Sequence, residues 1–157
     1  HQLMPKASVK RLIECKKKDL IDLVLDIEKY PEFVPFCYDA KIYENNDRGD
    51  LKNIIADLTI GKGPFKDTYK SDVVFNKKKD TVFVKNIDGP LNHLSNNWFF
   101  SDQKNGYTEV TFDIDFEIKN KFLNSLMIVS FQFGLEKIAD AFQKRAEELF
   151  HSSKNQI

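Results

Sequence analysis

The chain has 157 residues, and its 24 basic and 24 acidic side chains give a formal net charge of zero. A chain of this length can bury a substantial core as one domain. We expect a single domain over residues 1–157, with its core at residues 6–150. The balanced charge provides no overall attraction to nucleic acid, so we expect no DNA partner.

Cysteine spacing and apolar runs indicate the cellular compartment. Cys15 and Cys37 lack the C-x-x-C or Cys/His spacing of redox and zinc sites, so we interpret them as reduced, half-buried thiols of a cytosolic type of compartment. The sequence shows no signal peptide and no apolar run near the roughly 20 residues of a membrane span. We interpret His1–Leu3 as residues added before a native start at Met4.

The N-terminal part of the chain predicts one strand and two short helices. Ala7–Glu14 alternates imperfectly, as an edge strand does. Asp19–Ile27 has apolar residues at helical spacing and acids in its first turn. Tyr30 precedes a proline and ends this helix. Pro31–Phe36 combines two prolines with large apolar residues, which predicts a short helical turn and a rigid corner.

Six strands joined by short turns follow. The run Asn45–Asp50 is a strong turn signature and predicts a hairpin. Tyr107–Ile118 alternates between apolar residues and acids or Thr, which predicts one buried and one solvated face. The two faces of Thr81–Ile87 are too alike to orient it. The strand segments are Asp39–Glu44, Leu51–Ile60, Phe65–Phe75, Thr81–Ile87, Leu94–Phe100 and Tyr107–Ile118.

The segment Lys121–Phe150 predicts one long helix with two different halves. From Leu135 onward the apolar residues form a single stripe. Before Leu135 the segment is apolar on nearly all sides, so it must be covered on more than one face. A sheet together with a ligand, lid or membrane would cover it, and so would a strongly curved sheet alone. Gly134 weakens a helix, which suggests close approach of a strand or ligand.

These elements predict an α+β fold. Hairpin connections imply one antiparallel sheet whose apolar face needs cover, and the long helix is the predicted element with sufficient length. We expect a curved sheet of six to seven strands wrapped around this helix, with two short helices after the first strand. Such a wrap leaves a concave, mostly apolar space of the kind that binds small ligands.

Four motifs spread over the chain carry a family resemblance. They are Tyr30–Cys37 (YPEFVPFC), Asp88–Leu91 (DGPL), Leu94–Trp98 with Phe100, and Ala141–Phe142 with Arg145–Ala146. Over roughly Lys6–Phe150 the chain resembles the coenzyme Q-binding family of the START-like, helix-grip superfamily. Bacterial members of that family are often labelled oligoketide cyclase or lipid-transport proteins.

The resemblance implies a long C-terminal helix across the sheet and an apolar cavity. It implies that a polyprenylated quinone or similar lipid binds there in support of respiration. A second implied activity is binding to the large ribosomal subunit, which blocks subunit association. The expected location is the cytoplasm, with transient contact at the inner face of a bacterial inner membrane. No cofactor other than the bound ligand is expected.

We expect the ligand site to be formed by side chains of the corner, the strands and the long helix. Its residues are Phe33, Val34, Phe36, Phe65, Tyr69, Asn96, Trp98, Phe112, Phe116, Met127, Phe131 and Leu135. The corner is either a lid over the cavity or a hydrophobic plug. Asn96 bonds either a backbone carbonyl or a quinone carbonyl, because a buried polar group needs a partner. Trp98 and the helix residues are either core or ligand contacts.

The sequence nominates no catalytic or metal site. His93 has the parity opposite to Leu94 and Trp98, so we interpret it as a surface residue rather than a general base. The acids of Asp113–Glu117 lie on the wet face of a strand without a ligand-loop glycine, which favours a solvated face. We therefore predict a protein that is not an enzyme. A polyketide cyclase or dehydratase, which needs an acid–base pair inside the cavity, is the last alternative.

Two lysine clusters bear on the ribosomal alternative. Lys16–Lys18 and Lys77–Lys79 lie between periodic segments, and we interpret them as solvated loops. A patch for anionic lipid or RNA is the other interpretation. The neutral net charge argues against RNA binding, because such contacts depend on clustered Lys and Arg.

Overall fold

Seven strands and five helical segments make up the described part of the chain. The computed structural model describes the backbone of residues 6–151 and the side chains of residues 7–126 and 131–150. The strands are β1 (Lys6–Ile13), β2 (Cys37–Arg48), β3 (Leu51–Lys62), β4 (Phe65–Asn76), β5 (Thr81–Asp88), β6 (Leu91–Asp102) and β7 (Thr108–Ile118). The helical segments are α1 (Lys17–Leu25), the 3₁₀ turns η1 (Ile27–Glu32) and η2 (Lys104–Gly106), α2 (Lys121–Ala146) and the π turn η3 (Glu147–His151).

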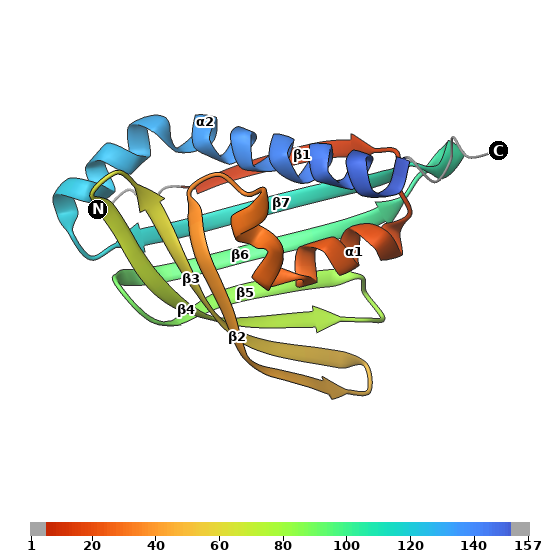
Figure 1. Ribbon diagram of the computed structural model, residues 1–157, viewed down its shortest axis with the longest axis horizontal. Coiled ribbons are helices and arrows are strands. Elements are labelled where there is room, and N and C mark those ends of the chain that lie inside the picture. Colours follow the sequence, from red (N-terminus) through yellow and green to blue (C-terminus); the bar gives the residue numbers. More distant parts are fainter. Residues whose placement is uncertain (1–5, 152–157) are drawn as a thin grey trace.

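One antiparallel sheet contains all of these strands, in the order β1-β7-β6-β5-β4-β3-β2. Strands β2 to β7 follow one another as hairpins, whereas β1 pairs with β7, from Lys6 opposite Asp115 to Ile13 opposite Thr108. The sheet is curved, and α2 lies across it along β1 and β7, while α1 contacts both β6 and α2 (Figure 1). This α+β arrangement confirms the helix-grip fold predicted from the sequence, including the two short helical segments after the first strand.

The first hairpin turns later than the sequence suggested. The turn is formed by Gly49–Asp50 and not by the whole of Asn45–Asp50, because Asn45–Arg48 pairs with Leu51–Ile54. Gly49 makes the tight turn possible, since its φ of +66° lies in the left-handed region that glycine adopts without steric cost. The ladder therefore extends through residues whose local preference is for a turn.

The first helix ends earlier than predicted. α1 spans Lys17–Leu25 rather than Asp19–Ile27, and the chain continues as the 3₁₀ turn η1 with Pro31 inside it. The N–H of Asp26 bonds the carbonyls of both Asp22 and Leu23, so the transition from α-helical to 3₁₀ bonding occurs there.

The core lies between α1, the second half of α2 and the inner face of the sheet. Trp98 and Phe100 point inward, as their shared parity on β6 predicted. Val82 is 1% exposed, whereas its neighbour Phe83 is 40% exposed, which orients β5. The buried core cluster consists of Ile13, Cys15, Leu20, Ile21, Leu23, Val24, Ile27, Ile54, Ala56, Val73, Val82, Trp98, Phe100, Val110, Phe142 and Ala146.

The two halves of α2 pack differently, as the difference between their apolar patterns predicted. The second half buries one stripe, formed by Leu135, Phe142 and Ala146. The first half leaves large apolar side chains in solvent: Phe122, Leu126 and Phe133 are 69%, 50% and 64% exposed. Within the described residues, the apolar surplus of the first half is therefore only partly covered by the sheet.

Candidate functional site

An aromatic cluster joins α2 to the sheet and to η1. The ring of Phe142 packs edge-on against three others, with centroid distances of 5.3 Å to Tyr30, 5.2 Å to Phe33 and 5.2 Å to Trp98. The ring of Trp98 also lies 4.3 Å from that of Phe112. Each such pair stabilises by about 0.5–1.5 kcal/mol beyond the area that it buries. The cluster anchors the second half of α2.

Trp98 and Asn96 are the two residues of the expected inner site that carry buried polar groups, and both form hydrogen bonds within the protein. The Trp98 Nε1–H donates to Asn96 Oδ1 at 3.2 Å, and Asn96 Nδ2 donates to the backbone carbonyl of Asp113 at 2.9 Å. Of the two partners considered for Asn96, the structure shows the backbone carbonyl. Both side chains are buried, and these two hydrogen bonds avoid the free-energy cost of an unpaired polar group.

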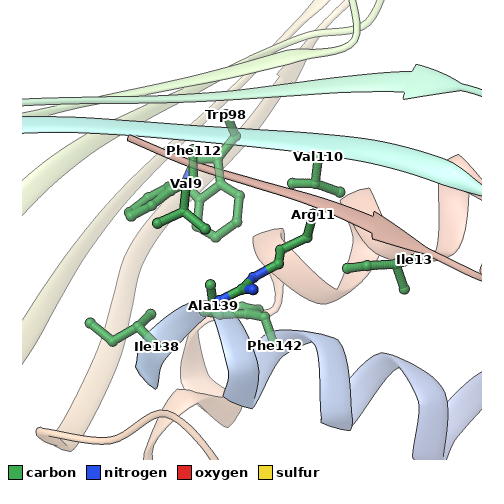
Figure 2. Close-up of a pocket in the computed structure, with 9 residues that line it drawn as sticks. All are labelled: Val9, Arg11, Ile13, Trp98, Val110, Phe112, Ile138, Ala139 and Phe142. Carbon is green, nitrogen blue, oxygen red and sulfur yellow. The ribbon is translucent and has the colours of Figure 1, made fainter. Parts of the chain in front are cut away.

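A small cavity lies beside this cluster, between α2 and the sheet (Figure 2). Its volume is about 30 Å³, room for about two water molecules and too little for a quinone ring. Trp98 and Phe112 of the expected site line it. The full lining is Val9, Arg11, Ile13, Trp98, Val110, Phe112, Ile138, Ala139 and Phe142.

Arg11 is the charged residue of the cavity lining, and its side chain lies on the same face of β1 as the buried Val9 and Ile13. Its Nη2 donates to Asp140 Oδ1 at 2.9 Å and to the carbonyl of Glu136 at 3.5 Å, which ties β1 to α2. Its Nε is buried and has no hydrogen-bond partner among the described residues. Sequence reasoning missed Arg11. The available signal was an arginine at the same parity as Val9 and Ile13.

The helix ridge expected to face the site leads from the cavity toward the first half of α2. The rings of Phe131 and Phe116 lie 4.6 Å apart in a T-shaped contact, and Leu135 is buried. The side chain of Met127, the third ridge residue, lies outside the described residues. The described part of the ridge is an apolar path between the cavity and the exposed first half of α2.

The corner after η1 packs against α2. Phe33 belongs to the aromatic cluster, and Val34 packs against the core. The carbonyl of Phe36 accepts a hydrogen bond from the Gly61 N–H at 2.9 Å. The Phe36 ring lies 4.0 Å from the position that a Cβ on Gly134 would occupy. This is an ordinary van der Waals distance, so among the described residues the structure does not show the close approach expected at Gly134.

Phe65 and Tyr69 lie on β4 and do not line the cavity. Phe65 is 58% exposed beside the β3–β4 turn. Tyr69 is partly buried, and this burial raises the pKa of its hydroxyl above the usual value. The expected residues thus fall into an inner group around Trp98 and Phe112 and an outer group that includes Phe65.

The two lysine clusters meet at the end of the molecule where α1 begins. Lys17 Nζ lies 2.8 Å from Asp80 Oδ2 and 3.0 Å from Asp102 Oδ2, which holds Lys16–Lys18 beside the β4–β5 turn and its Lys77–Lys79. The hydrogen bonds to these carboxylates raise the pKa of Lys17 above its usual value. Sequence reasoning placed both clusters in loops, whereas Lys17 and Lys18 begin α1, and it did not indicate that the clusters are neighbours.

The remaining polar residues that the sequence raised lie away from the cavity. His93 pairs with Asp115 on the outer face of the sheet. Among residues with described side chains, no group of three or more His, Cys, Asp or Glu could hold a metal ion. No helix in the described part of the chain is both long and apolar enough to cross a membrane.

Known proteins similar to this chain match it over most of its length. A family model described as "Polyketide cyclase / dehydrase and lipid transport" matches residues 14–143. The ribosome association toxin RatA of Rickettsia prowazekii is 32% identical over 142 residues, covering 88% of this chain and 94% of the toxin. The mitochondrial coenzyme Q-binding protein COQ10 of Dictyostelium discoideum is 31% identical over 135 residues, covering 83% of this chain and 63% of that protein. A solved START superfamily protein from Mycobacterium smegmatis shares the fold with a TM-score of 0.78 at 17% identity, covering 92% of this chain and 98% of that one.

Proposed function

The chain belongs to the polyketide cyclase/dehydrase and lipid transport family, and on this basis we propose that it is a non-catalytic binding protein. The supporting observation is the concave space under α2, which has aromatic walls and in which the Trp98 indole N–H is already paired with Asn96. Arg11 is the titratable residue among the described side chains of the cavity lining. A cyclase or dehydratase would need an acid–base pair there, so this alternative has no support from the described geometry.

Ribosome association is the cellular role that the relatives favour. The Rickettsia toxin is matched over nearly its whole length, whereas COQ10 is matched over less than two thirds of its own. The adjacent lysine clusters are a specific feature that suits such a role. Clustered ammonium groups attract the phosphates of ribosomal RNA even when the net charge of the whole chain is zero. Lys16, Lys18 and Lys79 are exposed there.

Charge reversal at this end tests the ribosomal role. The variant with Lys16, Lys18 and Lys79 all changed to Glu should co-sediment less with large ribosomal subunits. If the three lysines contact phosphates, the slope of log affinity against log salt should fall by about 2–3 over a series from about 50 to 200 mM. Wild-type protein that does not co-sediment, or a triple variant that binds as wild type does, would refute this role for the lysine clusters.

A matched control uses three exposed lysines at the opposite end of the molecule, where α2 begins (Figure 1). Changing Lys62, Lys119 and Lys121 to Glu alters the net charge by the same amount. This variant should retain the binding and the salt slope of the wild type. A loss equal to that of the first variant would indicate a general charge effect rather than a patch.

Binding of a polyprenylated quinone or a similar lipid is the second candidate, and the apolar surplus of α2 favours it. Phe122 and Phe133 expose apolar surface that a lipid tail or a membrane would cover. Because α2 is anchored at Phe142 and exposes several of its described side chains before Gly134, we expect its first half to move outward when the ligand enters, which would open space beside Phe116 and Phe131 and extend the cavity. Under this candidate the protein is cytoplasmic and contacts the inner face of the membrane transiently.

Extraction of the purified protein tests the quinone candidate. Protein from a quinone-producing host, purified without detergent, should carry near-stoichiometric quinone. A long isoprenoid tail buries enough apolar area, at about 25 cal/mol per Å², to stay bound on dilution. Phe131→Asp places a charge on the apolar path and should lower the bound amount. Phe99→Asp, on the exposed outer face of β6, should not. Extracts without quinone, together with no rise in melting temperature on adding quinone, would refute this candidate.

A further inference from the structure

The unpaired Nε of Arg11 is the starting observation. A buried N–H without an acceptor is unfavourable, and native structures rarely contain one. Arg11 lines the cavity, and Figure 2 shows its side chain extending from β1 toward Ala139 and Phe142. The side chain as a whole is 31% exposed, but the Nε atom is buried. The cavity of this structure exposes apolar surface, so a ligand oxygen reaches this unpaired donor only when the entering ligand enlarges the cavity.

The other donors near the cavity are already used. Trp98 Nε1–H donates to Asn96, and Asn96 donates to a backbone carbonyl. Neither needs a ligand oxygen. Arg145 has a buried Nε without a partner as well, but this residue pairs with Glu32 and does not line the cavity. Among the described residues, Arg11 is therefore the cavity residue with hydrogen-bonding capacity to spare.

The charge around Arg11 selects the type of acceptor. Asp140 Oδ1 lies 2.9 Å from Nη2 and balances the guanidinium charge. A ligand carboxylate would add a second negative charge to one cation in a partly buried site, where repulsion between like charges is weakly screened. A neutral carbonyl oxygen accepts the same hydrogen bond without this cost. The aromatic walls formed by Trp98, Phe112 and Phe142 suit a flat ring that carries such an oxygen.

The apolar path fixes the direction of the rest of the molecule. Phe116 lies four residues beyond Phe112 on β7, about 13 Å along the strand. Its ring contacts Phe131 of α2. Beyond this pair lie the exposed side chains of Phe122 and Leu126 in the first half of α2. An apolar tail attached to a ring near Arg11 would run along this path and leave the protein at that end.

We infer that Arg11 anchors the head of an apolar ligand, with its Nε–H donating to a neutral carbonyl oxygen while the tail extends past Phe116 and Phe131. This inference rests on the proposed binding of an apolar ligand under α2. It assigns to that site a head-group residue, a preferred acceptor and an orientation.

The test compares two probes that share a carbon skeleton. They are 2,3-dimethyl-1,4-naphthoquinone and 2,3-dimethylnaphthalene, which differ in the carbonyl oxygens. Equilibrium dialysis gives the Kd of each, and quenching of the single tryptophan, Trp98, shows that the quinone is bound beside it. The wild type should bind the quinone about tenfold more tightly, the effect expected of one hydrogen bond to a charged donor. Arg11→Met should bind both probes with the affinity that the wild type has for the hydrocarbon.

Arg145→Met is the matched control. Arg145 also pairs with one carboxylate, at 3.0 Å, and also has a buried unpaired Nε. The variant therefore removes the same chemical groups as Arg11→Met does, but from a residue that does not line the cavity. This variant should keep the tenfold preference. Arg11→Lys keeps the positive charge beside Asp140 but lacks the Nε–H, so it should lose the preference, and it serves if Arg11→Met does not fold.

The outcomes separate the inference from the function on which it rests. Equal affinity of the wild type for the two probes, or a preference that survives Arg11→Met, would overturn the role of Arg11 while leaving apolar-ligand binding in place. A preference that survives Arg11→Lys would overturn it as well. Failure of the wild type to bind either probe would overturn both the anchor and the apolar-ligand proposal.

Discussion

Truncation of two phenylalanines on one face of α2 tests whether the helix borders an adaptable space. Phe131 and Phe142 are about three helical turns apart and therefore lie on the same face. Phe142 is 6% exposed and contacts three aromatic rings. Phe131 is only partly buried and has a ring contact with Phe116.

The structure predicts unequal losses of stability. Phe→Ala in a filled core costs about 3–5 kcal/mol, and three aromatic contacts place Phe142→Ala near the upper end of that range. Phe131→Ala should cost about 1–2 kcal/mol, because a side chain next to exposed helix surface loses fewer contacts. The gain in helix propensity is the same for both variants and cancels in the comparison.

Urea unfolding followed by circular dichroism measures both variants. A difference of about 3 kcal/mol should also separate their melting temperatures by about 6–12 °C. Phe99→Ala, on the outer face, should stay within about 0.5 kcal/mol of the wild type. Equal losses for Phe131→Ala and Phe142→Ala would refute the reasoning, since they would mean that the first half of α2 lies on a fully packed interior.

Three further predictions concern a buried hydroxyl, a thiol and the exposed helix surface. Thr108, which is 1% exposed, donates from Oγ1 to the carbonyl of Cys15 at 2.7 Å, so Thr108→Val should lose about 1–3 kcal/mol in urea unfolding and Thr108→Ser clearly less; equal losses would contradict this hydrogen bond. Burial raises the pKa of the Cys37 thiol from 9.0 to about 11, so its contribution to stability is complete below pH about 9 and is lost as pH rises toward about 11. Denaturation across this range should show a steeper decline for the wild type than for Cys37→Ala, and parallel curves would argue against the shift. In liposome flotation, Phe122→Asp should reduce membrane binding while Phe99→Asp leaves it unchanged, and identical flotation of the wild type and both variants would remove Phe122 from any membrane contact.

The fold could be predicted because strand alternation and helical spacing are local properties. The shared parity of Trp98 and Phe100 identified the inner face of β6, and the change of pattern at Leu135 marked the two halves of α2. The first hairpin was placed less well. Asn45–Arg48 has the composition of a turn but is paired in the sheet, because backbone hydrogen bonds across the ladder outweigh a weak local preference.

The candidate site was less accessible to sequence reasoning because it depends on contacts between distant segments. Trp98 and Phe112 could be nominated from parity, and both line the cavity. The position of Arg11 beside them requires the pairing of β1 with β7 and the placement of α2, which no local pattern reveals. The same holds for the lysine clusters, which are brought together by the contact of Lys17 with Asp80.

The pairing of the first strand with the last also predicts an order of folding. Strands β2 to β7 are neighbours in sequence and can form as successive hairpins, whereas Val9 meets Phe112 only after a very long loop has closed. During synthesis on a ribosome, strands β2 to β7 can therefore pair with one another before β1 pairs with β7. Chevron analysis should give a low φ value for Val9→Ala in β1 and a higher φ value for Val73→Ala in β4. The space under α2 would then come into existence at the final step of folding, when β1 and α2 dock together.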